Sequence, residues 1–131
     1  MADIEVQSTC EEGYTVESVI NGDWELVIDA LNNDGPNPNE VLVADYISCY
    51  IPALRVAAGQ HDYDDIGEVE AEVTADLDED DDLEAVGFRV EIEADLGDDE
   101  QAIAELGEEI CHVHSALTEE LHADVSIESG V

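Results

Sequence analysis

Apolar and polar residues alternate along several stretches of this chain, a pattern typical of strands that bury one face. In the first part of the chain the alternation predicts strands over residues 4–8, 14–20 and 24–30. The Asn21-Gly22 pair between the last two is a strong signal for a hairpin turn. Further along, the same alternation predicts strands at the positions 69–77, 88–96 and 121–127. We therefore expect an antiparallel sheet with one face exposed to water.

A long apolar segment interrupts the strands and predicts a helix over about residues 39–58, ended by Gly59. Its strongly polar residues from position 41 onward are few: Asp45, Ser48 and Arg55. A helix that is apolar on nearly all sides must be buried on most of them, and one small sheet cannot cover it. We therefore expect a second copy of the chain to help, which makes the protein a homodimer.

A second helix is predicted to begin near Asp98-Asp99, because acidic residues suit a helix N-terminus. It runs to Cys111, and its inner face carries apolar side chains at helical spacing. The sequence shows no internal repeat and no linker. Residues 1–131 are therefore expected to form a single domain of the α+β class, with a long buried central helix.

The charge is extreme, with 37 acidic residues against two basic ones, Arg55 and Arg89, and a formal net charge of -35. Such a surface repels itself at ordinary ionic strength, but at about 1 M salt the Debye length falls to about 3 Å and the repulsion is screened. This balance predicts a protein of a halophilic organism. A nucleic-acid mimic or cation buffer is the alternative, disfavoured because the acids interleave with core residues. Binding to nucleic acid is excluded, since two arginines cannot neutralise phosphates.

The location of the protein is predicted from what its N-terminus and apolar segment contain. The first residues have neither a basic region nor an apolar run, so no export signal is expected. The longest apolar stretch, 41–58, includes Asp45, Pro52 and Arg55, and is interpreted as a buried helix instead of a membrane span. We expect a cytoplasmic protein that does not bind membranes. An odd count of three cysteines then favours free or redox-active thiols over a disulfide framework.

Two of the cysteines are candidates for chemistry. Cys49 lies midway along the long helix, where the alternative is a small core side chain. Cys111 ends the second helix and is followed by His112 and His114, which could hold a thiol as the reactive thiolate. The same residues with Cys49 could bind zinc, although no paired ligand spacing supports this. Cys10, at the end of the first strand, is interpreted as a spectator.

The segment GPNPNEVLVA at 35–44, followed by SCY at 48–50, then Leu54-Arg55 and Gly59, resembles a known signature. It is similar to that of the osmotically inducible protein C and organic hydroperoxide resistance family. In that family a second cysteine ends the later helix in a Cys-Pro-Val-x-x-Ala-Leu type segment, and here CHVHSAL occupies 111–117. The resemblance extends over nearly the whole chain, including the order of strands and helices.

The resemblance implies an intertwined homodimer that acts as a thiol peroxidase on organic hydroperoxides. By this resemblance, Cys49 is the attacking thiolate and becomes a sulfenic acid, and Cys111 condenses with it to a disulfide. A small dithiol or another thiol donor is the implied reductant, and no cofactor is implied beyond the cysteines. Glu40 matches the family glutamate. Glu40 lies nine residues before Cys49 on the same helix, which places the two side chains about half a turn out of phase. If Glu40 acts on a Cys49, we therefore expect it to act across the dimer interface. The alternative is that Glu40 is a helix N-terminal acid that interacts with the helix dipole.

The chain departs from the family pattern in two places. Family peroxidases use an arginine from the N-terminal strands to stabilise the thiolate, whereas this chain has no basic residue before Arg55. Arg55 and His112 are the candidate auxiliary residues, and His112 also replaces the family proline. Without a cation, a buried Cys49 is expected to have a raised pKa and react slowly. The alternative function is therefore a non-catalytic member that binds a small apolar or thiol ligand at the dimer interface.

Overall fold

The computed structural model describes residues 2–131. These fall into two compact units, the first ending at Leu42 and the second comprising Val43–Val131. Helix α1 (Pro38–Gln60) begins in the first unit and continues into the second. The α+β class with one long helix is confirmed. The single domain expected from the sequence stays a prediction.

The first unit is a three-stranded antiparallel sheet of β1 (Val6–Thr9), β2 (Thr15–Ile20) and β3 (Trp24–Asp29), in that order. Its three strands and the hairpin turn were predicted from the sequence. At the turn, Asn21 and Gly22 both have positive φ angles, 51° and 73°, which asparagine and glycine adopt most readily.

This sheet leaves many of its apolar side chains in contact with water. All four residues of β1 are exposed, and Trp24, which the alternation directs toward a core, is 72 % exposed. A three-stranded sheet with so little of its own core needs a hydrophobic covering to be stable. Within the first unit no described residue supplies that covering.

One buried carboxylate fixes the end of β3. Asp29 is 2 % exposed and accepts hydrogen bonds from the backbone N–H of Leu31 at 2.9 Å and Asp34 at 3.0 Å. It also accepts hydrogen bonds from the Asn33 N–H and the Thr15 hydroxyl. These donors, with the Leu31 N–H first, hold the pKa of Asp29 below its ordinary value despite burial.

The second unit holds a three-stranded sheet of β4 (Val69–Leu77), β5 (Leu83–Ile92) and β6 (Asp124–Ser129). β4 and β5 pair antiparallel, as predicted, whereas β6 pairs parallel to β5. The parallel pair arises because the chain crosses over through helices before β6. β5 also differs from the predicted strand at 88–96: it starts earlier and ends at Ile92, and Leu96, still fully buried, lies in the bend before the 3₁₀ turn η1 (Gly97–Asp99).

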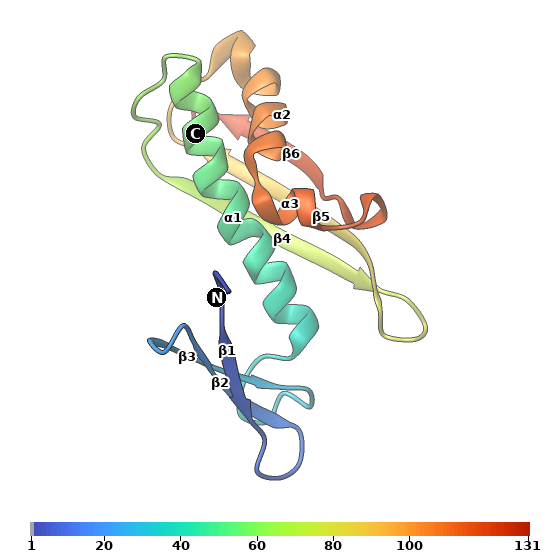
Figure 1. Cartoon of the computed structure of the whole chain (residues 1–131). Helices are drawn as coiled ribbons and strands as arrows, with labels where there is room; N and C mark the ends of the chain where they lie inside the picture. Colours follow the sequence, from blue (N-terminus) through green and yellow to red (C-terminus); the bar gives the residue numbers. More distant parts are fainter. Residues whose placement is uncertain (1) are drawn as a thin grey trace. The chain divides into compact units, whose positions relative to one another are not determined.

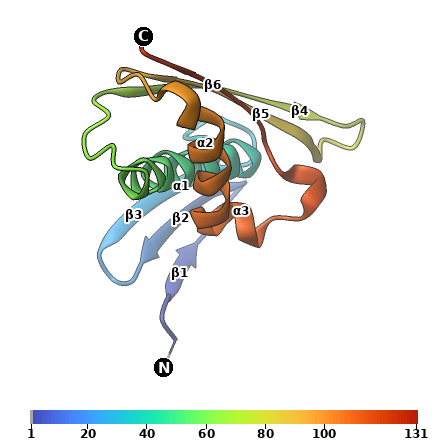
Figure 2. The same ribbon diagram turned by 90° about the horizontal axis from the view of Figure 1, so that it is seen from above.

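The crossover consists of α2 (Glu100–Ile110), the short helix α3 (His112–Ala116) and the 3₁₀ turn η2 (Glu119–Leu121). Figures 1 and 2 show α1 and α2 on the same face of the β4–β6 sheet. Gly107 lets the two helices approach closely: a Cβ there would lie 3.3 Å from the Tyr50 ring and 3.4 Å from the Leu54 Cα. The Tyr50 hydroxyl donates to the Ala104 carbonyl at 3.1 Å, which joins the helices in the core.

Only one face of α1 is buried within the second unit, by residues that pack on the sheet and α2. The opposite face keeps apolar side chains exposed, including Val56 at 51 %. By length and composition α1 is the one helix in the described residues that meets the requirements of a membrane span, as core helices of soluble proteins also do. The face of α1 that packs on the sheet agrees with the interpretation as a core helix.

Candidate active site

Two free thiols from different helices form the centre of the site. Cys49 is half-buried on α1, and Cys111 is fully buried between α2 and α3. Cys111 is extended (φ −65°, ψ 113°) and interrupts the helical chain, so α3 starts in a new direction. The Cys111 sulfur accepts a hydrogen bond from the His114 N–H at 3.5 Å, which caps α3.

The surroundings of Cys49 favour its thiolate. A hydrogen bond from the Val113 N–H is the largest effect that holds the pKa of Cys49 below its ordinary value. The Cys111 thiol and the His112 N–H act in the same direction, whereas burial and the charge of Asp45 oppose them. The groups that stabilise the thiolate are therefore the first N–H groups of α3 and a neighbouring thiol, instead of a cation.

The two thiols are shifted in opposite directions. Burial raises the pKa of Cys111, and its hydrogen bond to Cys49 and the charge of the Cys49 thiolate raise it further. Cys49 is therefore the more acidic of the two thiols, and Cys111 is the one that its surroundings favour in the protonated form. This arrangement supplies one nucleophilic sulfur with a second sulfur beside it, as a two-cysteine redox cycle requires.

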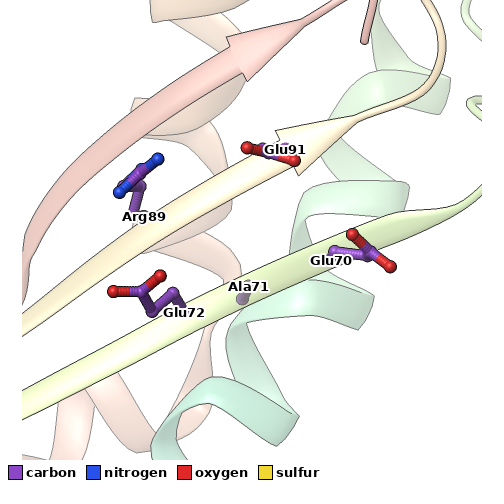
Figure 3. A pocket seen from close by; sticks show the side chains of 5 residues that line it. All are labelled: Glu70, Ala71, Glu72, Arg89 and Glu91. Atoms are coloured by element: carbon purple, nitrogen blue, oxygen red, sulfur yellow. The ribbon is translucent and has the colours of Figure 1, made fainter.

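The two arginines lie elsewhere in the second unit. The Arg55 guanidinium is exposed and donates to the Gly67 carbonyl at 2.7 Å. Arg89 lies on β5 between the buried residues Phe88 and Val90, so it projects from the opposite face of the sheet. Figure 3 shows Arg89 beside its cross-strand partner Glu72 in a shallow acidic pocket. In this chain neither arginine serves as the cation at Cys49.

His112 contributes to the site through its backbone. The side chain is exposed, while its N–H is one of the groups that lower the pKa of Cys49, after the Val113 N–H and the Cys111 thiol. The auxiliary role expected of His112 from the sequence stays a prediction. Proline at this position would have no N–H to give, and the departure from the family proline therefore adds a donor.

Glu40 serves the start of α1. Its carboxylate accepts hydrogen bonds from the Asn37 N–H at 2.8 Å and from the Asn32 side-chain amide at 2.5 Å. In return, the Glu40 N–H donates to Oδ1 of the Asn37 side chain. This reciprocal pair is a capping box, with Pro38 at the first helical position. The bond from Asn37 holds the pKa of Glu40 below its ordinary value. Glu40 belongs to the first unit and the thiols to the second, so its action across a dimer stays a prediction.

A second cluster of side chains adjoins the thiols. The buried Tyr46 hydroxyl lies 2.6 Å from Nδ1 of His114, and the His114 and His122 rings stack with centroids 3.8 Å apart. The sequence singled out His114 for its place after Cys111 but gave no signal for Tyr46 or His122; the three-residue spacing of Tyr46 and Cys49 on one helix could have indicated the tyrosine. The zinc hypothesis gains no support, since residues 2–131 hold no group of three metal-ligating side chains.

Comparison with known proteins identifies the family. The model of the family described as OsmC-like protein matches residues 31–126. A relative of uncharacterised function from Haloferax volcanii is 50 % identical over 128 residues, which cover 97 % of this chain and 96 % of the relative.

Solved structures agree with the fold. An OsmC-like protein from Mycoplasma pneumoniae has a TM-score of 0.82 at 15 % identity, covering 98 % of this chain and 97 % of that one. The organic hydroperoxide resistance protein OhrB of Bacillus subtilis has a TM-score of 0.70 at 20 % identity, covering 97 % and 98 %. At such identities the structures show a shared fold, and the sequence match establishes kinship: the chain belongs to the OsmC-like protein family.

Proposed function

We propose that this protein is a thiol peroxidase that reduces organic hydroperoxides through Cys49 and Cys111. What supports it is a pair of interacting thiols whose pKa values are shifted in opposite directions: that of the half-buried Cys49 is lowered and that of the buried Cys111 is raised. The hydroperoxide resistance protein among the structural relatives agrees with this reaction class. The sequence led us to expect a raised pKa and slow reaction of Cys49 without an arginine; the lowering effect of the α3 N–H groups on its pKa supports the proposal instead.

The proposed reaction has two steps. The Cys49 thiolate attacks the terminal oxygen of the hydroperoxide, the O–O bond breaks, and the alkoxide leaves as the alcohol after taking a proton. Cys49 is then a sulfenic acid. The Cys111 sulfur attacks the Cys49 sulfur, a disulfide forms, and the hydroxyl group leaves as water with the Cys111 proton. A small dithiol reduces the disulfide by thiol–disulfide exchange and is itself oxidised.

The Cys111 pKa fits the second role. A thiol kept protonated by burial does not compete with Cys49 for peroxide, because the thiolate is the nucleophile. Once Cys49 becomes a sulfenic acid, the thiolate charge that raised the Cys111 pKa is gone. Cys111 then ionises more readily, which favours the second step after the first.

The test is single-turnover reaction with cumene hydroperoxide in molar potassium chloride. The proteins are Cys10→Ser, which removes the exposed third thiol, and the same protein carrying Cys49→Ser or Cys111→Ser. We expect the parent to consume one peroxide per chain and form a Cys49–Cys111 disulfide. Cys49→Ser should be inert, and Cys111→Ser should stop at a sulfenic acid. A parent that reacts no faster than a free thiol contradicts the proposal and favours the non-catalytic alternative, a binder of small apolar or thiol ligands.

We also propose that the working form is a homodimer. The first unit exposes Trp24, Ile4 and Leu31 at 72, 70 and 59 %, and the outer face of α1 exposes Val56. A second copy of this acidic chain can cover these residues at molar salt, because the repulsion between the two copies is then screened. Light scattering across molar potassium chloride should give twice the chain mass, and a monomer there contradicts the proposal. The extreme acidity supports a cytoplasm of high salt as the setting.

A further inference from the structure

One hydrogen bond joins the two helices that carry the thiols. Tyr46 lies three residues before Cys49 on α1, and His114 lies three residues after Cys111 on α3. The Tyr46 hydroxyl oxygen is 2.6 Å from His114 Nδ1, and Tyr46 is 2 % exposed. The bond therefore fixes α3 against α1 close to the point where the α3 N–H groups meet Cys49.

The proton in this bond has a defined place. The Ala123 N–H already donates to the Tyr46 oxygen at 3.0 Å. The tyrosine has a single proton, and in this buried position it would lack an acceptor if His114 Nδ1 were also a donor. Tyr46 therefore donates to His114, which must be neutral at Nδ1 with its proton on Nε2.

We propose that Tyr46 and His114 are positioning residues that hold the N-terminal turn of α3 against Cys49, and that they do so only while His114 is neutral. The inference rests on the proposed function. In this proposal His114 does not replace the missing arginine as a positive charge. Backbone N–H groups stabilise the Cys49 thiolate, and His114 keeps those groups in place.

The groups around His114 support the neutral form. From α1 the Tyr46 hydroxyl faces its ring, while its backbone N–H donates to the Cys111 sulfur. After η2 the His122 ring stacks on it, and burial together with His122 lowers the pKa of His114. Glu108 of α2 interacts electrostatically with both Tyr46 and His122. Phe88 of β5 packs edge-on against Tyr46 and adds no charge.

Protonation of His114 has a distinct consequence. An N–H at Nδ1 faces the Tyr46 hydroxyl and leaves the tyrosine proton without an acceptor, so the contact between α1 and α3 is weakened. The N–H groups of the α3 turn are then held less firmly toward Cys49. The reactivity of Cys49 should therefore fall on the acid side more steeply than protonation of its own thiolate accounts for.

The test is the pH profile of Cys49 alkylation by iodoacetamide, which needs no peroxide. It is measured in the Cys10→Ser background, with the label located by mass spectrometry, for Tyr46→Phe, His114→Asn and Tyr63→Phe. Asn keeps an acceptor near the place of Nδ1 but cannot be protonated. Tyr63 is the matched control, because its hydroxyl is also held by two contacts in the same unit, to the Leu96 carbonyl and the Asp99 carboxylate.

We expect Tyr46→Phe to slow alkylation about fivefold below the Cys49 titration, the effect of one lost hydrogen bond, and Tyr63→Phe to match the parent. His114→Asn should keep the parent rate near neutral pH and decline with a slope of one, whereas the parent declines more steeply. Equal effects of the two tyrosine variants, or a parent rate that rises as His114 is protonated, overturn the inference. Since alkylation does not depend on peroxide, this result stands apart from success or failure of the peroxidase assay.

Discussion

The sharpest test of the site is the substitution His112→Pro, which removes one backbone N–H and restores the residue type of the family segment. The fold should tolerate it. His112 is the first residue of α3, where proline is favoured. Cys111 before it has φ −65° and ψ 113°, an extended conformation that a following proline accepts.

The expected magnitude follows from the hydrogen bond that is lost. A bond to a charged group contributes about 1.5–3 kcal/mol when buried. Cys49 is half-exposed, so water replaces part of that contribution and about 1 kcal/mol remains. The thiolate population of Cys49 at a given pH below its titration should then fall about fivefold. The bond from Val113, the larger effect, remains in place.

Alkylation of Cys49 in the Cys10→Ser background measures this population, with His112→Ala as the matched control. Alanine removes the exposed imidazole and keeps the N–H, so His112→Ala should react at nearly the parent rate. His112→Pro should move the pH profile of Cys49 alkylation to higher pH. It should also slow peroxide reduction by the same factor of about five. If His112→Ala slows as much as His112→Pro, the imidazole acts at the site and the backbone account is wrong.

Three further predictions concern the stability of the protein and its response to pH and salt. Leu54→Ala should lower the free energy of unfolding by about 2–5 kcal/mol because it leaves a cavity in the core, as Leu54 is fully buried; urea titration in molar potassium chloride measures it, and a loss no larger than that of Leu77→Ala at the exposed end of β4 would contradict the packing. The pKa of Asp29 lies below its ordinary 3.8 in the folded protein, so its stabilisation is complete above that value and is lost as the pH falls through the folded-state pKa. Asp29→Asn should lower the melting temperature at neutral pH, and the melting temperature of this variant should fall less than that of the parent as the pH is lowered. If both proteins lose the same stability in acid, other carboxylates are responsible for that loss. Dilution from about 2 M to about 0.2 M potassium chloride should lower the unfolding midpoint, because the Debye length grows as salt is removed and the net charge is -35; an unchanged midpoint would show that the acidic surface is not a salt adaptation.

The sequence predicted the order of elements because their apolar periods are clear. The alternation at 69–77 corresponds to β4, and the apolar segment at 39–58 to α1. The direction of β6 was not predictable in this way, since a strand with one buried face shows the same alternation in parallel and antiparallel pairs. The exposure of Trp24 was missed for a related reason: a pattern shows which face is apolar, but not whether this chain or another covers it.

The site was predictable as a pair of cysteines, and its electrostatics were not. Residue types carry the signal for Cys49 and Cys111, whereas the groups that lower the Cys49 pKa are backbone N–H groups, which every residue but proline has. Their arrangement depends on one extended residue, Cys111, between two helices. The Tyr46–His114 bond was equally hidden, because it joins residues 68 positions apart.

The replacement of an arginine by backbone donors is consistent with the charge of the whole chain. With two arginines among 37 acidic residues, an exposed cation is surrounded by competing carboxylates, as Arg89 is by Glu70, Glu72 and Glu91. Molar salt further weakens the attraction between an exposed guanidinium and a thiolate, since charges more than about 3 Å apart are then screened. A hydrogen bond from a backbone N–H acts at contact distance, and neither carboxylates nor salt ions compete with it once α3 is folded. If the proposed function holds, a Cys49 thiolate stabilised by the N–H groups of His112 and Val113 would therefore keep its reactivity in molar salt.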